Sequence, residues 1–326
     1  MIAVGLVVKM LRYRIASLLL PFLLLGPAFH ERLLSFHWQQ AAALIALCAS
    51  YVVATSLNDV FDLEVDRVNH AGSRARPLVS GEATARHLLL LAAIAALVSL
   101  VAAAVVGPAA GALAFSSLLL NVAYSVPPLR LCARSLAAPV LLALAYVALP
   151  YGLGLASIAA APDTVDARVI ASFAVLFLAR MLLKDFRDLR GDTAFGKRTF
   201  LVVHGKQATL AFALTCIVVG NALLLTVIPA VPLLAACVEA YFGGVLIQLY
   251  RLWRAGDAQA EQLAIATGAR MGNAVVLTLL GALLLMAAGA PPGQQAAFVV
   301  TLAVLFWAVY VYATARPEQA LAAYRG

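Results

Sequence analysis

Long apolar stretches alternate along the chain with short polar segments. No Asp, Glu, Lys or Arg occurs in residues 88–129, 135–162, 207–238 or 271–315. A helix that crosses a membrane needs about 20 apolar residues, so each stretch has room for one or two spans, divided by turn residues such as Gly107-Pro108. The pattern predicts an all-α polytopic membrane protein with candidate spans at about 15–33, 40–60, 87–106, 109–125, 136–160, 168–185, 208–228, 231–250, 272–289 and 295–314.

Composition and charge agree with a membrane protein. The 326 residues are 64% hydrophobic and 12% charged, whereas soluble domains contain about 45–50% apolar and about 25% charged residues. The net charge of +8 could indicate a nucleic-acid-binding protein, but such a protein carries its basic residues on one face of a soluble fold. Here they lie in short loops between apolar stretches. We therefore expect membrane lipid, and no nucleic acid, as a partner.

The basic residues also indicate an orientation. Of the 23 Lys and Arg residues, only Arg32 and Arg168 fall in the short loops on one side of the predicted membrane. Cytoplasmic loops carry an excess of Lys and Arg. We therefore expect both termini and the long loops to be cytoplasmic, which in a prokaryote means an integral protein of the inner membrane.

A first acidic cluster ends the second predicted span and reads N-D-V-F-D-L-E-V-D. Asn58, Asp62 and Asp66 follow one another at four-residue intervals, so on a helix they share one face, about 6 Å apart. Carboxylates this close repel one another, and their hard oxygens favour Mg²⁺, which proteins usually share with substrate phosphates. The alternative is a solvated helix end, and Asp59 and Glu64, which point elsewhere, are interpreted in that way.

A second cluster ends the sixth predicted span and reads K-D-F-R-D-L-R-G-D. It contains Lys184, Asp185, Asp188 and Asp192. Gly191 is expected to loosen the helix end so that Asp192 can turn toward the first cluster. Arg180 lies one turn before Lys184 inside the predicted span, where a charged side chain indicates a functional site. We expect an anionic ligand as its partner, whereas Lys184 could instead extend to the membrane interface.

Together these residues indicate chemistry on a membrane-bound diphosphate. Two facing sets of carboxylates that hold Mg²⁺, with cations inside the membrane, are suited to clamp a diphosphate at the cytoplasmic boundary. The membrane can accommodate a hydrocarbon tail, which points to an allylic polyprenyl diphosphate. Metal and basic side chains would neutralise the leaving diphosphate while C1 of the prenyl group becomes a carbocation.

The two clusters resemble the motifs N-x-x-x-D-x-x-x-D and D-x-x-x-D of the UbiA superfamily of intramembrane prenyltransferases. Residues 76–81 (RPLVSG), 124–130 (YSVPPLR) and 196–199 (GKRT) resemble three further motifs of that family. The resemblance extends over roughly residues 12–290, with an additional span at about 295–314. It implies a single transmembrane prenyltransferase domain over 1–326. It also implies a bundle of nine to ten helices, with a central cavity open to the cytoplasmic side and the lipid.

The resemblance also implies roles for individual residues. The implied Mg²⁺ ligands are Asn58, Asp62, Asp66, Asp188 and Asp192, Lys184 is implied to contact the diphosphate, and Tyr124 and Ser125 are placed near the reacting carbons. We expect Asp185 as a further metal ligand, and Arg180, Arg67, Arg76 and Arg130 as further diphosphate-binding residues. Arg180 departs from the family pattern, in which many members carry a Tyr at this position. The implied reaction is Mg²⁺-dependent transfer of a polyprenyl group to a small lipophilic, aromatic or phosphate-bearing acceptor. A terpene cyclase on the same scaffold, which needs no separate acceptor, is the alternative.

Two other classes of membrane protein fit less well. A CDP-alcohol phosphotransferase also uses aspartates and Mg²⁺, but its D-G-x-x-A-R motif is absent. A transporter would carry its charges near the membrane midplane, whereas both acidic clusters lie at one boundary. Glu239, near the middle of a predicted span, could be protonated, be paired with a buried polar group, or belong to an acceptor pocket.

Overall fold

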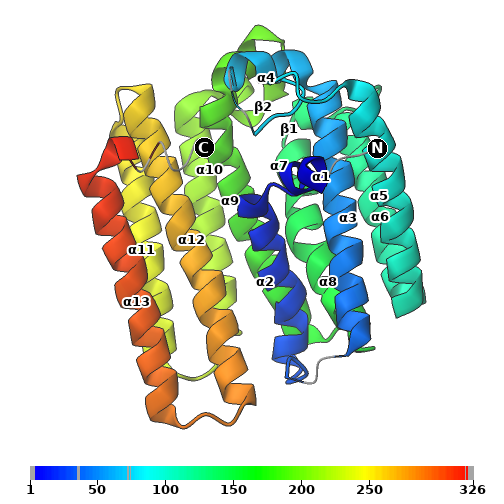
Figure 1. The fold of residues 1–326 in the computed structure, drawn as a ribbon. Coiled ribbons are helices and arrows are strands. Elements are labelled where there is room, and N and C mark those ends of the chain that lie inside the picture. Colours follow the sequence, from blue (N-terminus) through cyan, green and yellow to red (C-terminus); the bar gives the residue numbers. More distant parts are fainter. Residues whose placement is uncertain (1–3, 35–36, 72, 74, 320, 322–326) are drawn as a thin grey trace. The chain divides into compact units, whose positions relative to one another are not determined.

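The structure is a computed structural model that describes residues 4–34, 37–71, 73, 75–319 and 321. Nearly all of this part of the chain is helical (Figure 1). It forms two compact units. The first contains residues Met1–Pro27, Ser35–Pro162 and Asp188–Val203, and the second contains Ala28–Leu34, Asp163–Arg187 and His204–Gly326.

The first unit combines membrane-length helices with short polar elements at one end. Its elements are α1 (Val4–Leu11), most of α2 (Tyr13–Phe29), α3 (Trp38–Phe61), α4 (Leu63–Asn69), α5 (Ala85–Val106), α6 (Pro108–Ser125), η1 (Leu131–Ala133), β1 (Arg134–Ser135), α7 (Ala137–Ala143), η2 (Leu144–Ala148), α8 (Leu149–Ser157), the end of α9 (Thr164–Ala194), β2 (Arg198–Thr199) and the start of α10 (Phe200–Leu225). α4, β1 and β2 lie at its upper end in Figure 1.

Small residues and side-chain hydrogen bonds hold α3 against α5 and α6. Alanines from all three helices share one buried cluster, and small side chains let membrane helices approach closely. The Ser99 hydroxyl donates to the Ala46 carbonyl over 2.9 Å, and the Asn121 amide donates to the Ser50 carbonyl over 3.0 Å. These contacts make a scaffold whose ends, at Phe61 and Ser125, carry the polar elements.

The second unit is a bundle of long helices. It contains α9 up to Arg187, α10 from His204, α11 (Pro232–Arg254), α12 (Ala258–Ala287) and α13 (Pro292–Ala315), of which the last three run side by side (Figure 1). The Ser172 hydroxyl of α9 donates to the Gly220 carbonyl of α10 over 2.8 Å. The Gln248 amide of α11 donates to the Tyr310 hydroxyl of α13 over 2.8 Å.

The helical elements confirm the all-α membrane fold, although the predicted spans at 15–33 and 168–185 are not among the described helices that are long and apolar enough to cross a membrane. Within the described residues, eight helices are long and apolar enough to cross a membrane, and Leu18–Phe29 of α2 is a shorter apolar helix. α9 continues to Ala194, past the predicted end at 185, and α12 begins at Ala258, before the predicted start at 272. Apolar patterning marks only the lipid-facing length of a helix, whereas its backbone hydrogen bonds continue through polar turns.

Candidate active site

The first acidic motif crosses the junction between α3 and α4. Asp62 lies between the two helices with φ −108° and ψ 12°. The helical hydrogen bonds nevertheless continue, because the Asp62 N–H donates to the Asn58 carbonyl over 2.9 Å and the Asp66 N–H donates to the Asp62 carbonyl over 2.8 Å. The predicted four-residue spacing is therefore kept across the break. The Asn58 side-chain amide also donates to Asp62 Oδ2 over 3.0 Å.

The second motif does not loosen at Gly191, so that prediction was wrong. α9 remains helical through Ala194, and Gly191 instead permits a close approach by α4. The Asn69 side chain donates to the Asp188 carbonyl over 3.0 Å and accepts from the Gly191 N–H over 2.7 Å. A Cβ at Gly191 would lie 2.6 Å from the Asn69 carboxamide atoms. Asn69, which sequence reasoning missed, thus holds the first motif beside the second.

Lys197 joins the two motifs through its side chain. Its Nζ lies 2.7 Å from Asp62 Oδ2 and 3.8 Å from Asp192 Oδ1. The turn after α9 places it there, because Gly196 adopts φ +67° and the Lys197 N–H donates to the Asp192 carbonyl over 2.9 Å. This is the left-handed helix end that favours glycine. The sequence contains a signal for this position: Gly196 follows a helix whose last turns carry the predicted ligand Asp192, and the basic residue Lys197 comes directly after it.

His70 lies between the two motifs, and Arg76 pairs with the first of them. His70 Nε2 lies 3.9 Å from Asp66 Oδ1 and 4.0 Å from Asp188 Oδ1. Arg76, from the RPLVSG segment, places a guanidinium nitrogen 2.9 Å from Asp66 Oδ2. Sequence reasoning missed His70, although it lies one helical turn after Asp66, whereas Arg76 was among the predicted residues.

Arg130 approaches Asp62 from the other side. Its guanidinium donates to Asp62 Oδ1 over 2.9 Å. Parallel pairing of β1 with β2 holds the segment after Arg130 beside the segment after Lys197, so two cations reach different oxygens of one carboxylate. Tyr124 and Ser125 end α6 just before this segment. Tyr124 is half-buried, and Ser125 is buried with a hydroxyl that has no hydrogen-bond partner among the described residues.

Asp59 and Glu64 differ from each other in environment. Glu64 is exposed and pairs with Arg67 over 2.6 Å, as expected of an ordinary surface charge. Asp59 is only 2% exposed and forms ion pairs with Arg12 and Arg76, so its interpretation as a solvated charge was wrong. The placement of Arg67 on the exposed side gives no support to its predicted contact with a diphosphate.

Burial and nearby cations shift the pKa values of the two carboxylates of the first motif in opposite directions. Burial raises the pKa of Asp66 to about 6, although Arg76 acts in the opposite direction. Burial also acts to raise the pKa of Asp62, but Lys197 and Arg130 outweigh it, and the pKa is lowered. A carboxylate removed from water needs a cation close by. Both therefore favour positive charge at this site.

The donor set fits a hard divalent cation. Asp62, Asp66 and Asp192 are each buried to at least nine-tenths, and Asp188 lies beside His70 next to them. Carboxylate oxygens are the ligands that Mg²⁺ prefers. The bridging Lys197 ammonium shows that a cation is accommodated between the oxygens of the two motifs.

Three predicted site residues lie in the second unit. Arg180, Lys184 and Asp185 belong to the part of α9 before Asp188. Arg180 donates to Asn273 Oδ1 of α12 over 2.7 Å and lies 3.4 Å from the Ala269 carbonyl. The described structure therefore gives Arg180 protein partners inside this unit.

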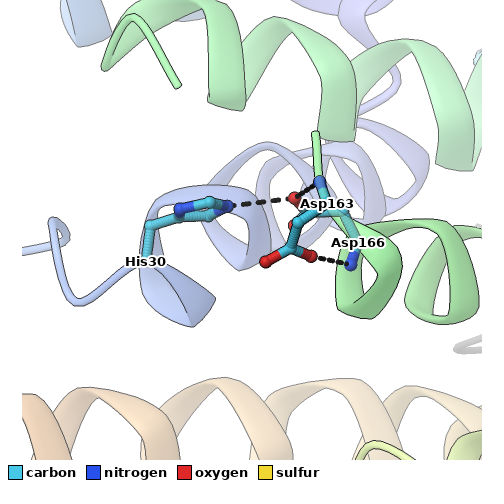
Figure 2. Close-up of side chains that lie close together, drawn as sticks. All are labelled: His30, Asp163 and Asp166. Carbon is cyan, nitrogen blue, oxygen red and sulfur yellow. Dashed lines mark hydrogen bonds and ion pairs between the residues drawn. The ribbon is translucent and has the colours of Figure 1, made fainter. Parts of the chain in front are cut away.

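Three residues of types that can bind a metal, His30, Asp163 and Asp166, lie close together in the second unit. Their hydrogen bonds give them a structural role. His30 Nε2 lies 3.0 Å from Asp166 Oδ2, which also accepts the Asp163 N–H over 2.8 Å (Figure 2). Asp163 Oδ1 in turn accepts the N–H groups of Val165 and Asp166. These are the reciprocal bonds of a helix N-terminus. The cluster thus caps α9 and fastens His30 to it.

Glu239 also has a partner in the second unit. The Asn221 side-chain amide of α10 donates to its Oε1 over 3.0 Å and its Oε2 over 3.1 Å. Of the three possibilities for this carboxyl group, the structure shows pairing with a polar side chain, but at an exposed rather than a buried position.

Comparison with known proteins identifies related chains. A model described as the UbiA prenyltransferase family matches residues 19–268. The bacteriochlorophyll synthase 33 kDa chain of Rhodobacter capsulatus is 32% identical over 184 residues, which are 54% of this chain and 58% of that relative. This chain thus covers less than two thirds of that relative. Digeranylgeranylglyceryl phosphate synthase of Methanothrix thermoacetophila is 30% identical over 233 residues, which are 69% of this chain and 80% of the relative.

Solved structures share the fold. A UbiA homologue from Archaeoglobus fulgidus, bound to GPP and Mg²⁺, superposes with a TM-score of 0.57 at 19% identity and covers 94% of this chain and 98% of its own. At this identity the likeness establishes the architecture alone. Because the family model matches residues 19–268, which are most of the chain, the chain belongs to the UbiA prenyltransferase family.

Proposed function

We propose that this protein transfers a prenyl group from an allylic polyprenyl diphosphate to a small lipophilic, aromatic or phosphate-bearing acceptor. The observation that carries the proposal is the meeting of four aspartates from two distant motifs, with Lys197 and His70 between them. Relatives with 30% or more identity include a digeranylgeranylglyceryl phosphate synthase and a bacteriochlorophyll synthase. Their names support prenyl transfer and leave several acceptor classes to be tested.

The residues divide into three proposed roles. Mg²⁺ would be held by Asn58, Asp62, Asp66, Asp188 and Asp192, with Asp185 as a further ligand candidate, and when bound it supplies Lewis-acid neutralisation of the leaving group. Arg76 and Arg130 bind the diphosphate, and for Lys184 and Arg180 this role rests on the sequence motifs alone. Tyr124 and Ser125 flank the reacting carbons.

The proposed reaction needs no nucleophilic side chain. The bond between C1 and the diphosphate oxygen breaks, and the electron pair leaves with the diphosphate. The allylic cation at C1 then bonds to the acceptor, which releases a proton. Basic side chains fixed before the reaction stabilise the charge that develops on the diphosphate.

Product analysis tests this function. Purified protein with MgCl₂, geranyl or geranylgeranyl diphosphate and a panel of phosphate-bearing and aromatic acceptors is expected to release diphosphate and form an acceptor that is heavier by one prenyl group in mass spectra. A cyclised prenyl product formed without acceptor would show that the protein cyclises the prenyl chain and does not transfer it. No release of diphosphate from any donor would contradict both.

We further propose that the site and both termini face the cytoplasm, at the inner membrane in a prokaryote. In a background without the four native cysteines, Leu34→Cys and Leu129→Cys form a matched pair, because the native side chains are 54% and 50% exposed. The excess of basic residues on the Leu129 side predicts that an impermeant maleimide labels intact cells only at position 34. Labelling at position 129 before lysis would overturn the orientation.

A further inference from the structure

Lys197 holds a place that a metal ion would need. Its ammonium lies within hydrogen-bond distance of Asp62 Oδ2 and 3.8 Å from Asp192 Oδ1. Lys197 is only 8% exposed, and both aspartates are buried. A single charge thus lies between carboxylates from the two motifs, where our proposed function places Mg²⁺.

The backbone of Lys197 is fixed while its side chain can move. The Lys197 N–H is bonded to the Asp192 carbonyl, and the next two residues pair with β1. The side chain is a flexible four-carbon stem that ends in a compact charge. The ammonium can therefore leave the carboxylates without any change in the turn that carries it.

An ammonium group and a divalent cation compete for Asp62 Oδ2. Two cations beside the same carboxylate oxygen repel each other at an effective dielectric constant of about 20. Binding of either cation therefore weakens binding of the other. A competing internal cation weakens metal binding, because the metal has to displace it.

We propose that Lys197 is a built-in counter-ion that holds the two aspartate motifs together in the metal-free protein and withdraws when the divalent cation binds. Lys197 is thus a positioning residue that sets the affinity for the metal. This inference rests on the proposed metal site. The lysine therefore has two opposite effects. Without metal it stabilises the contact between the two motifs, and in the presence of metal it competes with the metal ion for the carboxylates.

Metal binding without substrate tests the proposal. Mn²⁺ serves as the probe, with affinity measured by electron paramagnetic resonance and with thermal melts in chelator and in Mn²⁺. In chelator, Lys197→Met is expected to melt at a lower temperature than wild type. Its melting temperature is expected to rise more than that of wild type when Mn²⁺ is added. It should also bind Mn²⁺ about tenfold more tightly, because a competing charge has gone. Lys197→Gln removes the charge but keeps a hydrogen-bond donor and serves if the Met variant does not fold.

Two variants serve as controls. Lys197→Arg keeps the positive charge and is expected to bind Mn²⁺ close to the wild-type affinity. Lys206→Met removes a lysine that pairs with Glu261 over 2.7 Å in the second unit. It is expected to lower the melting temperature equally with and without Mn²⁺ and to leave the affinity unchanged, as a merely structural ion pair would.

The outcomes separate this inference from the proposed function. If Mn²⁺ binds wild type but not Asp62→Asn, and the uncharged Lys197 variants bind it no more tightly than wild type, the counter-ion role is refuted and the metal site stands. If wild type and Asp62→Asn bind Mn²⁺ alike, the proposed metal site itself is refuted.

Discussion

Replacing any one of Asp62, Asp66, Asp188 and Asp192 with Asn is expected to lower prenyl transfer at least about a hundredfold. A metal ion contributes several kcal/mol of charge stabilisation in the transition state, and each 1.36 kcal/mol is tenfold in rate. Asparagine keeps the shape of the side chain but removes its charge, so the variants should still insert and fold. Turnover with MgCl₂ and the melting temperature are measured on each variant.

Glu64→Gln is the matched control for these variants. Glu64 lies inside the first motif but is exposed and pairs with Arg67, and exposed pairs contribute little. Its removal should change turnover by less than about twofold, as expected for a surface pair. Near-wild-type turnover in two of the four aspartate variants would remove the assignment of the metal site.

The features of the site that depend on residues close together in the chain could be predicted from the sequence. The spacing of Asn58, Asp62 and Asp66 depends on helical hydrogen bonds four residues apart, which the structure retains even at the break between α3 and α4. The spans follow from apolar length in the same way. Both signals act along one segment, so no knowledge of the tertiary fold is needed.

The different environments of Asp59 and Glu64 were not accessible in this way. Both lie inside the same motif and differ in the direction they face. Asp59 is buried because Arg12 and Arg76 reach it from other segments, whereas Glu64 is exposed and pairs with its neighbour Arg67. Burial of a charge depends on partners distant in sequence, and the pattern around Asp59 does not contain them.

Lys197, His70 and Asn69 were missed for a related reason. Each lies within a few residues of a predicted ligand, but its role depends on a contact with the other motif. His70 matters because Asp188 lies 4.0 Å from it, and Asn69 because Gly191 lacks a side chain. A glycine in a helical acidic motif was interpreted as a flexible point, whereas here it is a point of close approach.

Gly191→Ala is therefore expected to separate the two motifs. The added methyl group would lie 2.6 Å from the Asn69 carboxamide, which must move and lose its bonds to the Asp188 carbonyl and the Gly191 N–H. Two net hydrogen bonds are worth about 1–3 kcal/mol, more than the roughly 0.5–1 kcal/mol that Ala gains over Gly in a helix. We expect a lower melting temperature and a loss of turnover, since Asp188 and Asp192 lie on the displaced turns.

Two further variants show whether steric exclusion is the cause. Gly111 lies inside α6 with nothing within 4 Å of an added Cβ, so Gly111→Ala should gain stability and keep its turnover. Asn69→Ala removes the carboxamide that the methyl group would meet. The double variant Asn69→Ala/Gly191→Ala should therefore be less destabilised than the sum of the two single variants, because neighbouring residues that share a contact are not additive. Strict additivity, or a Gly191→Ala protein as stable and active as Gly111→Ala, would show that Asn69 does not hold the two motifs together.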